Sequence, residues 1–355
     1  MRTARLRWAI SVLCTTAVVL AFGLACGPAA TSSTPTPTPQ KVTFQAGYLP
    51  QGNISFVAAY VAKEKGFFAA QGLDVTIEHS SGSGEQYQRL AAKEIQFTTT
   101  PGDIEVKQVA DQGVPFVSIT VFGHAGDQGL MVLDNGRVST PKDLEGKKVG
   151  YKFFPEPWML AMFDAAGVDQ GKVELVSVGF DPRVLLPETG AGQVDAVNVF
   201  KSNEPDIMAK AGFPVKVFRP EDFDIHFLGQ TYVTHADFIR DDPEMVRRFV
   251  RATMKGLEWA IDPDNRSEVG DIIMKYAGAD ADRDHNLFIF ETEASYVSAD
   301  STQKVGLGYA SPEEWQAMMD VLLKYKAIGA TPALNAVWAP QFVESVYKDG
   351  KLVWP

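Results

Sequence analysis

Apolar and polar residues alternate regularly where the folded part of the chain begins. Residues 42–46 (VTFQA) and 73–77 (LDVTI) have the two-residue period of half-buried strands, and the segment between them predicts a helix that ends at residues 64–68 (EKGFF). A strand, loop, helix, strand unit makes a right-handed crossover, and its first loop lies at the carboxyl edge of a mostly parallel sheet. Residues 48–53 are therefore the first candidate wall of a ligand site.

The alternation of strands and helices continues through the middle of the chain. After further strands at 95–99 and 115–122, Thr140-Pro141-Lys142-Asp143 gives the start signals of a helix, and a second series of strands follows at 147–151, 173–178, 194–200 and 215–219. Residues 230–234 predict a strand that returns to the first group. The pattern predicts an α/β fold with two lobes joined by two crossing segments: lobe 1 from residues 41–131 and 233–355, and lobe 2 from residues 132–232.

The last third of the chain is predicted to be helical. Val246, Phe249, Val250, Thr253 and Leu257 share one face at helical spacing, which is typical of a helix that packs on a core. Ser311-Pro312-Glu313-Glu314 is a capping box with proline at the first helical position. The helix that it begins is predicted to pack through Trp315, Met318, Met319 and Leu322.

The N-terminus has the pattern of an export signal. Three arginines at positions 2, 5 and 7 precede an uncharged apolar run at 8–24, so residues 1–25 are predicted to be a signal peptide. A membrane anchor is the alternative, but the run is shorter than the roughly 20 residues that a spanning helix needs. Ala25-Cys26 resembles the cleavage and lipidation site of bacterial lipoproteins, and residues 26–40, rich in threonine and proline, predict an extended tether. We expect an exported protein anchored by lipid at Cys26 and facing outside.

Composition and charge narrow the function further. The 355 residues carry a formal charge of -11, which argues against nucleic acid or an anionic membrane surface as the main partner. The five histidines are scattered, and Cys26 would be the one cysteine left after cleavage, so we expect no metal site, no cofactor and no disulfide. A monomer is expected.

Two segments resemble a known family. Residues 61–68 (VAKEKGFF) with 72–75 (GLDV), and residues 141–150 (PKDLEGKKVG), are similar to solute-binding proteins of ABC importers, in the branch that contains thiamine-pyrimidine, riboflavin and sulfonate or taurine binders. The resemblance implies the type II periplasmic-binding-protein fold. It also implies that a small molecule is captured between the lobes and delivered to a membrane permease.

Candidate ligand-binding residues stand at the predicted ends of strands and starts of helices. Aromatic candidates, which can stack a planar ring, are Tyr48, Phe56, Tyr87, Phe154 and Trp158. The polar candidates are Asn53, Thr100, Asp103, Glu156, Asn198, Asn203 and Glu204. The aromatic candidates have a structural alternative, because most of the 22 phenylalanines must fill cores. Asp103 and Glu204 would also stabilise the start of a helix as negative charges.

These candidates favour a heteroaromatic vitamin, with riboflavin ahead of a thiamine-precursor pyrimidine. A sulfonate is less favoured, since no arginine cluster stands at these loops. Fungal pyrimidine synthases share the superfamily and use a histidine and a cysteine-rich motif. This chain has Phe56 at about the place of that histidine and lacks the motif, and it has no Walker or Gly-x-Ser-x-Gly sequence, so we expect no enzyme. A ligand-sensing surface lipoprotein that feeds no transporter is a further alternative.

Overall fold

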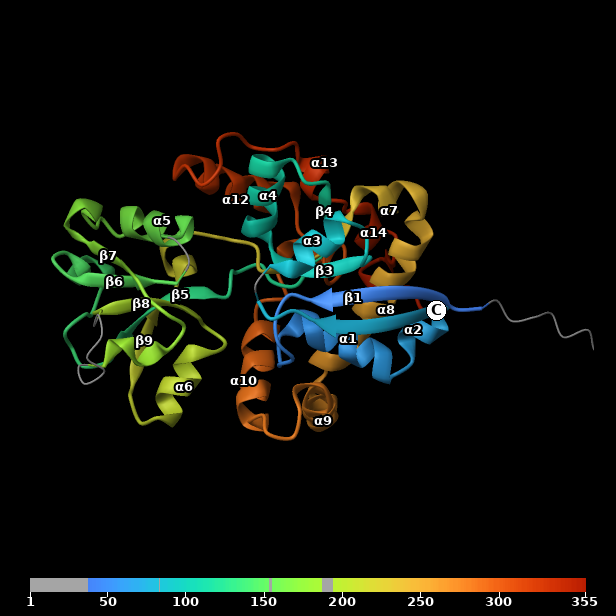
Figure 1. Cartoon of the computed structure of the whole chain (residues 1–355), viewed down its shortest axis with the longest axis horizontal. Helices are drawn as coiled ribbons and strands as arrows, with labels where there is room; N and C mark the ends of the chain where they lie inside the picture. The colour runs from blue at the N-terminus through green and yellow to red at the C-terminus, as the bar shows by residue number, and fades with distance from the viewer. Residues whose placement is uncertain (1–37, 83, 153–154, 187–193) are drawn as a thin grey trace, which may run out of the picture. The chain divides into compact units, whose positions relative to one another are not determined.

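The computed structural model describes residues 38–82, 84–152, 155–186 and 194–355 (Figure 1). Within them, two five-stranded sheets and a short two-stranded sheet form. The first sheet has the order β2 (Leu73–His79), β1 (Gln40–Ala46), β3 (Phe97–Pro101), β10 (Gln230–His235), β4 (Phe116–Val121). The second has the order β7 (Glu174–Ser177), β6 (Lys148–Tyr151), β8 (Ala196–Phe200), β5 (Gln128–Leu133), β9 (Val215–Phe218). The third pairs β11 (Tyr347–Lys348) with β12 (Lys351–Leu352).

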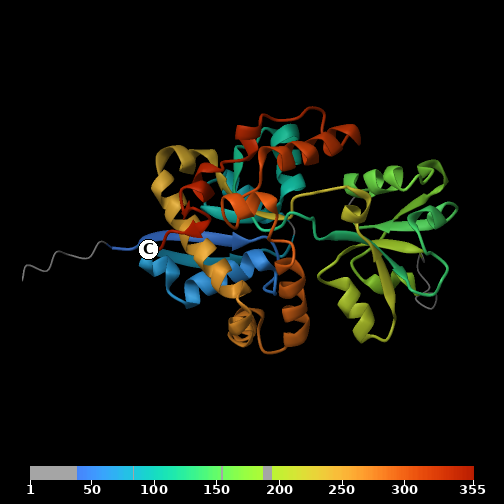
Figure 2. The ribbon, with the colours of Figure 1, turned by 180° about the vertical axis from the view of Figure 1, so that it is seen from behind.

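Helices surround the two larger sheets (Figures 1 and 2). Those that precede β5 or follow β10 are α1 (Ile54–Glu64), α2 (Phe67–Ala70), α3 (Glu85–Ala91), α4 (Gly102–Gln112), α7 (Ala236–Asp241), α8 (Pro243–Ile261), α9 (Arg266–Ala277), α10 (Arg283–Ala294), α11 (Asp300–Lys304), α12 (Pro312–Lys324), α13 (Leu334–Val337) and α14 (Gln341–Glu344). Between β5 and β10 lie α5 (Pro157–Ala165) and α6 (Glu204–Lys210). Short 3-10 helices are η1 (Pro141–Leu144), η2 (Gln170–Lys172), η3 (Pro182–Leu185), η5 (Pro220–Phe223) and η6 (Pro263–Asn265).

Each large sheet contains one strand that is antiparallel to both of its neighbours. In each case the chain enters that strand directly from the other sheet. In the first sheet, β10 is antiparallel to both β3 and β4, while β1 is parallel to β2 and β3. In the second, β5 is antiparallel to β8 and β9, while β6 is parallel to β7 and β8. The chain therefore crosses twice at the carboxyl ends of the parallel strands, before β5 and before β10.

The strand pairings place these crossings at strand ends. The lobe limits expected from the sequence, 131/132 and 232/233, fall inside β5 and β10, yet hydrogen bonds join each of these strands as a whole to one sheet. A strand cannot be divided between two sheets without breaking its ladder. We retain the division into two lobes as a prediction and move its limits to the residues just before Gln128 and Gln230.

The long helices pack as their apolar patterns predicted. All five stripe residues of α8 are buried, from Val246 to Leu257, and Phe249 stacks on Phe97 with ring centroids 3.9 Å apart. Helix α12 begins with the expected capping box and buries its four predicted core residues. The start signals at Thr140 give only the single 3-10 turn η1, because Glu145 is already extended and Gly146 follows with φ at +78°.

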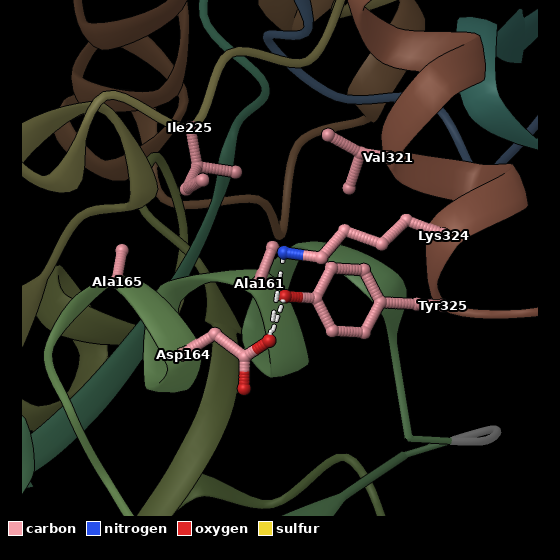
Figure 3. Close-up of a pocket in the computed structure, with 7 residues that line it drawn as sticks. All are labelled: Ala161, Asp164, Ala165, Ile225, Val321, Lys324 and Tyr325. Atoms are coloured by element: carbon pink, nitrogen blue, oxygen red, sulfur yellow. Dashed lines mark hydrogen bonds and ion pairs between the residues drawn. The ribbon is translucent and has the colours of Figure 1, made fainter.

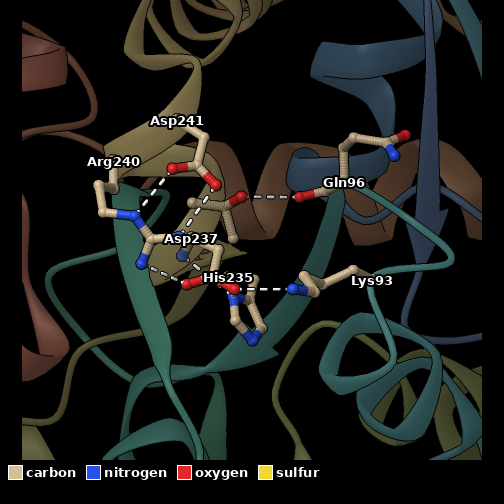
Figure 4. Close-up of polar contacts among 7 residues, drawn as sticks. Lys93, Gln96, His235, Asp237, Arg240 and Asp241 are labelled. Atoms are coloured by element: carbon tan, nitrogen blue, oxygen red, sulfur yellow. Dashed lines mark hydrogen bonds and ion pairs between the residues drawn. The ribbon is translucent and has the colours of Figure 1, made fainter.

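A polar network lies where β10 ends and α7 begins (Figure 4). His235 Nδ1 accepts the backbone N–H of Asp237 at 3.0 Å and thereby caps α7. Lys93 and Arg240 both pair with the Asp237 carboxylate, and their hydrogen bonds lower its pKa to about 2. Because β10 is antiparallel, its end lies at the sheet edge opposite to the crossings. The network therefore fastens α7 to the loop before β3 and lies away from the candidate site.

Candidate ligand-binding site

The carboxyl ends of the parallel strands in both sheets face the crossing segments. In the first sheet, Pro101 at the end of β3 pairs with Gln230, the first residue of β10. In the second, Phe200 at the end of β8 pairs with Gln128, the first residue of β5. The segments that carry the sequence candidates lie at or after the ends of β1, β2, β3, β6 and β8. All of them therefore leave their sheets at the edge where the chain crosses, which is where ligands of α/β sheets bind.

Three polar candidates come together in the interior. Asn198 Nδ2 donates to Glu156 Oε1 at 3.0 Å, and the Trp158 indole N–H donates to Glu156 Oε2. Burial, and then the charge of Asp103, raises the pKa of Glu156 to about 8. Burial also raises the pKa of Asp103, to about 6. Glu156 and Asp103 follow strands of different sheets, so the structure brings their carboxyl groups close enough to interact.

Asn198 keeps an acceptor without a partner. Its side chain is 2% exposed, and Oδ1 makes no hydrogen bond to any residue that the structure describes. A buried amide oxygen without a donor is unfavourable by about 1–3 kcal/mol. Asn198 Oδ1 therefore keeps its capacity to accept a hydrogen bond beside Glu156.

Glu204 and Lys152 form a buried pair at the end of β8. The Lys152 ammonium contacts Glu204 Oε1, while Glu204 Oε2 accepts the backbone N–H of Phe200 at 2.8 Å. Glu204 also lies in the first turn of α6, where a negative charge stabilises the start of the helix. This is the structural role that the sequence offered as the alternative to ligand binding. The Lys152 ammonium lies 5.1 Å from the ring centroid of Phe200.

The candidates of the first sheet differ in accessibility. Tyr48 is 41% exposed, and its carbonyl accepts His79 Nδ1–H at 2.8 Å. Tyr87 and Thr100 share a hydrogen bond of 2.8 Å between their hydroxyl groups, and burial raises the pKa of Tyr87 to about 12. Tyr48 is free to meet a ligand, whereas the Tyr87 hydroxyl is already engaged.

Two aromatic candidates are buried. Phe56 is 3% exposed within α1 and packs edge-on against the ring of His79, and Trp158 is 1% exposed. Phe154, like the lipidation candidate Cys26, lies outside the described residues. The ligand-binding roles of Phe56, Trp158 and Phe154 and the lipidation of Cys26 stay predictions.

A second polar cluster lies at the crossings and was not predicted. Glu293 of α10 accepts from Asn53 Nδ2 at 2.5 Å and from the backbone N–H of Ile54 at 2.7 Å. Ser202, just after β8, contacts Glu293 Oε1 at 3.3 Å, and its hydroxyl also donates to Asp127. Asn53, a ligand candidate, is thus held by Glu293. No local pattern marked Glu293, which is one of several acidic residues of α10. Asp127 could have been found from its position just before β5, where the chain crosses.

A hollow of about 230 Å³ separates α5 from α12 (Figure 3). Ala161, Ala165 and Val321 give it apolar walls. At its rim the Tyr325 hydroxyl donates to Asp164, with Lys324 Nζ 3.6 Å from the same carboxylate. The hollow is bridged by these contacts and lies apart from Asp103, Glu156 and Asn198.

The described residues contain no group of three or more histidine, cysteine, aspartate or glutamate side chains that could hold a metal ion. Among their helices, none combines the length and apolar character required to cross a membrane.

Comparison with known proteins identifies the family. A family model described as NMT1/THI5 like matches residues 53–266, which is more than half of the chain. The chain belongs to the NMT1/THI5-like family. The resemblance read from residues 61–75 and 141–150 is thereby confirmed.

Two relatives of this family member carry binding-protein names. Riboflavin-binding protein RibY of Chloroflexus aurantiacus is 26% identical over 318 residues, which cover 86% of this chain and 87% of RibY. The formylaminopyrimidine-binding protein of Halalkalibacterium halodurans is 29% identical over 216 residues, which cover 59% of this chain and 64% of that protein.

Solved structures confirm the fold. The periplasmic aliphatic sulphonate binding protein SsuA from Escherichia coli aligns with a TM-score of 0.65 over 86% of this chain and 99% of SsuA, at 14% identity. The chain therefore has the two-lobed type II periplasmic-binding-protein fold. At this identity the likeness concerns the fold alone.

Proposed function

We propose that this protein is the substrate-binding component of an ABC import system. In this proposal it captures a small heteroaromatic vitamin, riboflavin first, between its two lobes and delivers it to a membrane permease. Membership of the NMT1/THI5-like family supports the proposal, as does the similarity to RibY over most of both chains. We propose a binding protein without catalytic activity, exported and held at the outer face of the membrane by lipid on Cys26.

The free acceptor of Asn198 carries the choice of ligand. Asn198 Oδ1 is buried without a donor from the described residues, and the carboxyl groups of Glu156 and Asp103 lie nearby. The free oxygen of Asn198 favours a ligand that brings N–H or O–H donors. The imide N–H of a flavin ring and the hydroxyl groups of its ribityl chain are donors of this kind. The absence of an arginine among these side chains favours a neutral ligand over a sulfonate.

A thiamine-precursor pyrimidine is the second candidate. An aminopyrimidine presents an exocyclic amino group that two acceptors such as Asp103 and Asn198 Oδ1 can share. The similarity to the formylaminopyrimidine-binding protein supports this alternative, although the alignment covers less of the chain than the alignment with RibY.

Tryptophan fluorescence titration tests the proposal. We expect riboflavin to quench the fluorescence of the mature protein saturably, and Asn198→Ala to weaken its binding by about 5- to 100-fold, which corresponds to one lost buried hydrogen bond. Asn135→Ala is the matched control, since Asn135 is exposed and caps a turn of the chain. We expect it to bind as the wild type does.

The other results discriminate between the candidates. Saturable binding of an aminopyrimidine but not of riboflavin would select the second candidate. Binding of neither, with a folded protein, would contradict both, and unchanged uptake of these compounds after deletion would contradict the transport role.

A further inference from the structure

Two carboxyl groups, of buried Glu293 and half-buried Asp127, lie where the chain crosses between the lobes. Asp127 precedes β5, and Glu293 lies in α10, with the Ser202 hydroxyl in contact with both. A small cavity beside them is lined by Gly123 and Ala125 of the first crossing and by Gly229 and Gln230 of the second. The two crossings are joined there, because Gly229 N–H donates to the Gly123 carbonyl at 2.9 Å. The carboxyl pair therefore lies at the hinge of the fold.

The hydrogen bonds in this cluster require an additional proton. A serine hydroxyl has one proton, so it can donate to Asp127 or to Glu293 but not to both. Glu293 Oε1 lies 3.3 Å from Ser202 Oγ, and that contact becomes a hydrogen bond only if one of the carboxyl groups is protonated. The other donors to the pair are neutral groups: Asn53 Nδ2, Ile54 N–H and Ser202 N–H.

The charged residues near Asp127 and Glu293 do not remove the need for an additional proton. Lys201 adjoins Asp127 and lowers its pKa, but its ammonium already pairs with Glu221 at 2.6 Å. It also lies 4.6 Å from the ring centroid of Tyr296, whose own pKa is raised by burial and by the charges of Asp127 and Glu221. The charge of Arg219 lowers the pKa of Tyr296, but its guanidinium pairs with Asp222 and not with Asp127 or Glu293. If both carboxyl groups were ionised, the positive charge beside them would be Lys201, and Glu221 already neutralises that charge.

We propose that Asp127 and Glu293 share one proton in the arrangement of the lobes that this structure has, and that movement of Ser202 away from Glu293 releases it. Ser202 follows β8 of the second sheet, whereas Glu293 holds the start of α1 beside the first. A change in lobe arrangement therefore separates the hydroxyl from Glu293 and admits water to the pair. We take the arrangement of this structure as the one that holds the ligand, so that ligand capture, which rests on the proposed function, is coupled to proton uptake.

The pKa directions agree with this geometry. Burial raises the pKa of Glu293 to about 7. Burial, and then the charge of Glu293, raises the pKa of Asp127 well above its ordinary range. Near neutral pH the pair therefore holds a proton in the folded protein that the unfolded chain does not bind.

A test without ligand measures melting temperature against pH for the wild type and Glu293→Gln. An amide reproduces the size of a protonated carboxyl group but cannot ionise. Because the folded pKa of Glu293 is above its ordinary value of 4.5, wild-type stability from this group falls as pH rises from about 4.5 to about 7. The melting temperature of Glu293→Gln relative to wild type should therefore rise over this range and level off above it. Glu291→Gln, an exposed position on the same helix that pairs with Arg266, should stay parallel to wild type.

Parallel curves for the wild type and Glu293→Gln would overturn the proposal. Asp127→Asn provides a second amide variant with the same expected behaviour. Loss of folding in both variants would also overturn it, since each amide has the size and the neutral charge of a protonated carboxyl group and keeps one carbonyl acceptor and an N–H donor.

Coupling to capture is measured by calorimetric titration with riboflavin in buffers of different ionisation enthalpy. We expect the wild type to take up a fraction of a proton on binding and Glu293→Gln to take up less. Riboflavin binding without any proton uptake would overturn the coupling. If riboflavin does not bind at all, the proposed ligand fails, while the melting experiment still decides on the shared proton.

Discussion

Glu105 lies on α4 with no exposed side-chain surface. The Ser118 hydroxyl donates to its Oε2, while Oε1 has no hydrogen-bond partner among the described residues. Burial is the main cause that raises the pKa of Glu105 to about 8. A carboxyl group with one satisfied oxygen in an apolar interior is more stable when protonated. Glu105 is therefore a neutral hydrogen-bonding group at physiological pH.

We expect Glu105→Gln to remove one source of pH dependence. Because the folded pKa is above the ordinary value of 4.5, wild-type stability from this group falls as pH rises from about 4.5 to about 8, by up to about 1.4 kcal/mol per pH unit. The free energy of unfolding, measured in urea at several pH values, should therefore fall less steeply in Glu105→Gln. Glu244→Gln, at an exposed position, should leave the slope unchanged, and equal slopes in all three proteins would contradict the prediction.

At the scale of elements, α1 and α8 cross at very short distance. A Cβ atom placed on Gly256 of α8 would lie 2.2 Å from the carbonyl oxygen of Ala58 and 3.2 Å from the Cβ of Ala62. Both alanines are fully buried in α1, so their small side chains permit the approach. The same helix α1 begins at Asn53 and Ile54, which Glu293 holds. The position of α1 on α8 therefore affects the hinge cluster.

We expect Gly256→Ala to destabilise the protein by about 1–3 kcal/mol, since the two helices must move apart to admit the methyl group. Urea unfolding of the mature protein measures the effect. Gly179→Ala is the control, because its Cβ would meet no heavy atom within 4 Å and its φ is not in the left-handed region. A Gly256→Ala variant as stable as the control would contradict the close crossing.

At the scale of the whole molecule, the lobes are also joined away from the hinge. The Tyr325 hydroxyl at the end of α12 contacts Asp164 of α5, and this hydrogen bond lowers the pKa of Asp164 (Figure 3). On the other side, Lys210 of α6 pairs with Asp282 before α10 at 2.7 Å. Such contacts favour one arrangement of the lobes without touching the proposed ligand.

We expect Tyr325→Phe to weaken ligand binding by about 2- to 5-fold, mainly through faster dissociation, since one exposed hydrogen bond between lobes contributes about 0.5–1 kcal/mol. Stopped-flow fluorescence with riboflavin, or with the pyrimidine if that is the ligand, measures the rate. Gln316→Ala, on the same helix but bonded only to Asp320 within it, should match wild type. A dissociation rate equal to wild type would show that this contact does not favour the bound arrangement.

The sequence by itself determined the local structure and the class of fold. Its apolar periods placed the stripe of α8 and the strands β1 and β2, and Ser311 with Glu314 marked the start of α12, because periodicity and caps depend on neighbours within a few residues. It also placed Asp103 and Glu156 just after the ends of strands, since the carboxyl edge of a parallel sheet follows from chain direction. The expected strand-end position of Asn198 was wrong, because Asn198 is the middle residue of β8.

Only the tertiary structure decided which of these side chains meet. Asn53 and Glu293 are 240 positions apart, and Ser202 and Glu293 are 91 apart, so no local pattern relates them. Their contact depends on how α10 packs on α1 and where the crossings place β8. The free acceptor of Asn198 and the raised pKa of Glu156 have the same origin, because burial and partners are properties of the packed chain and not of its local sequence.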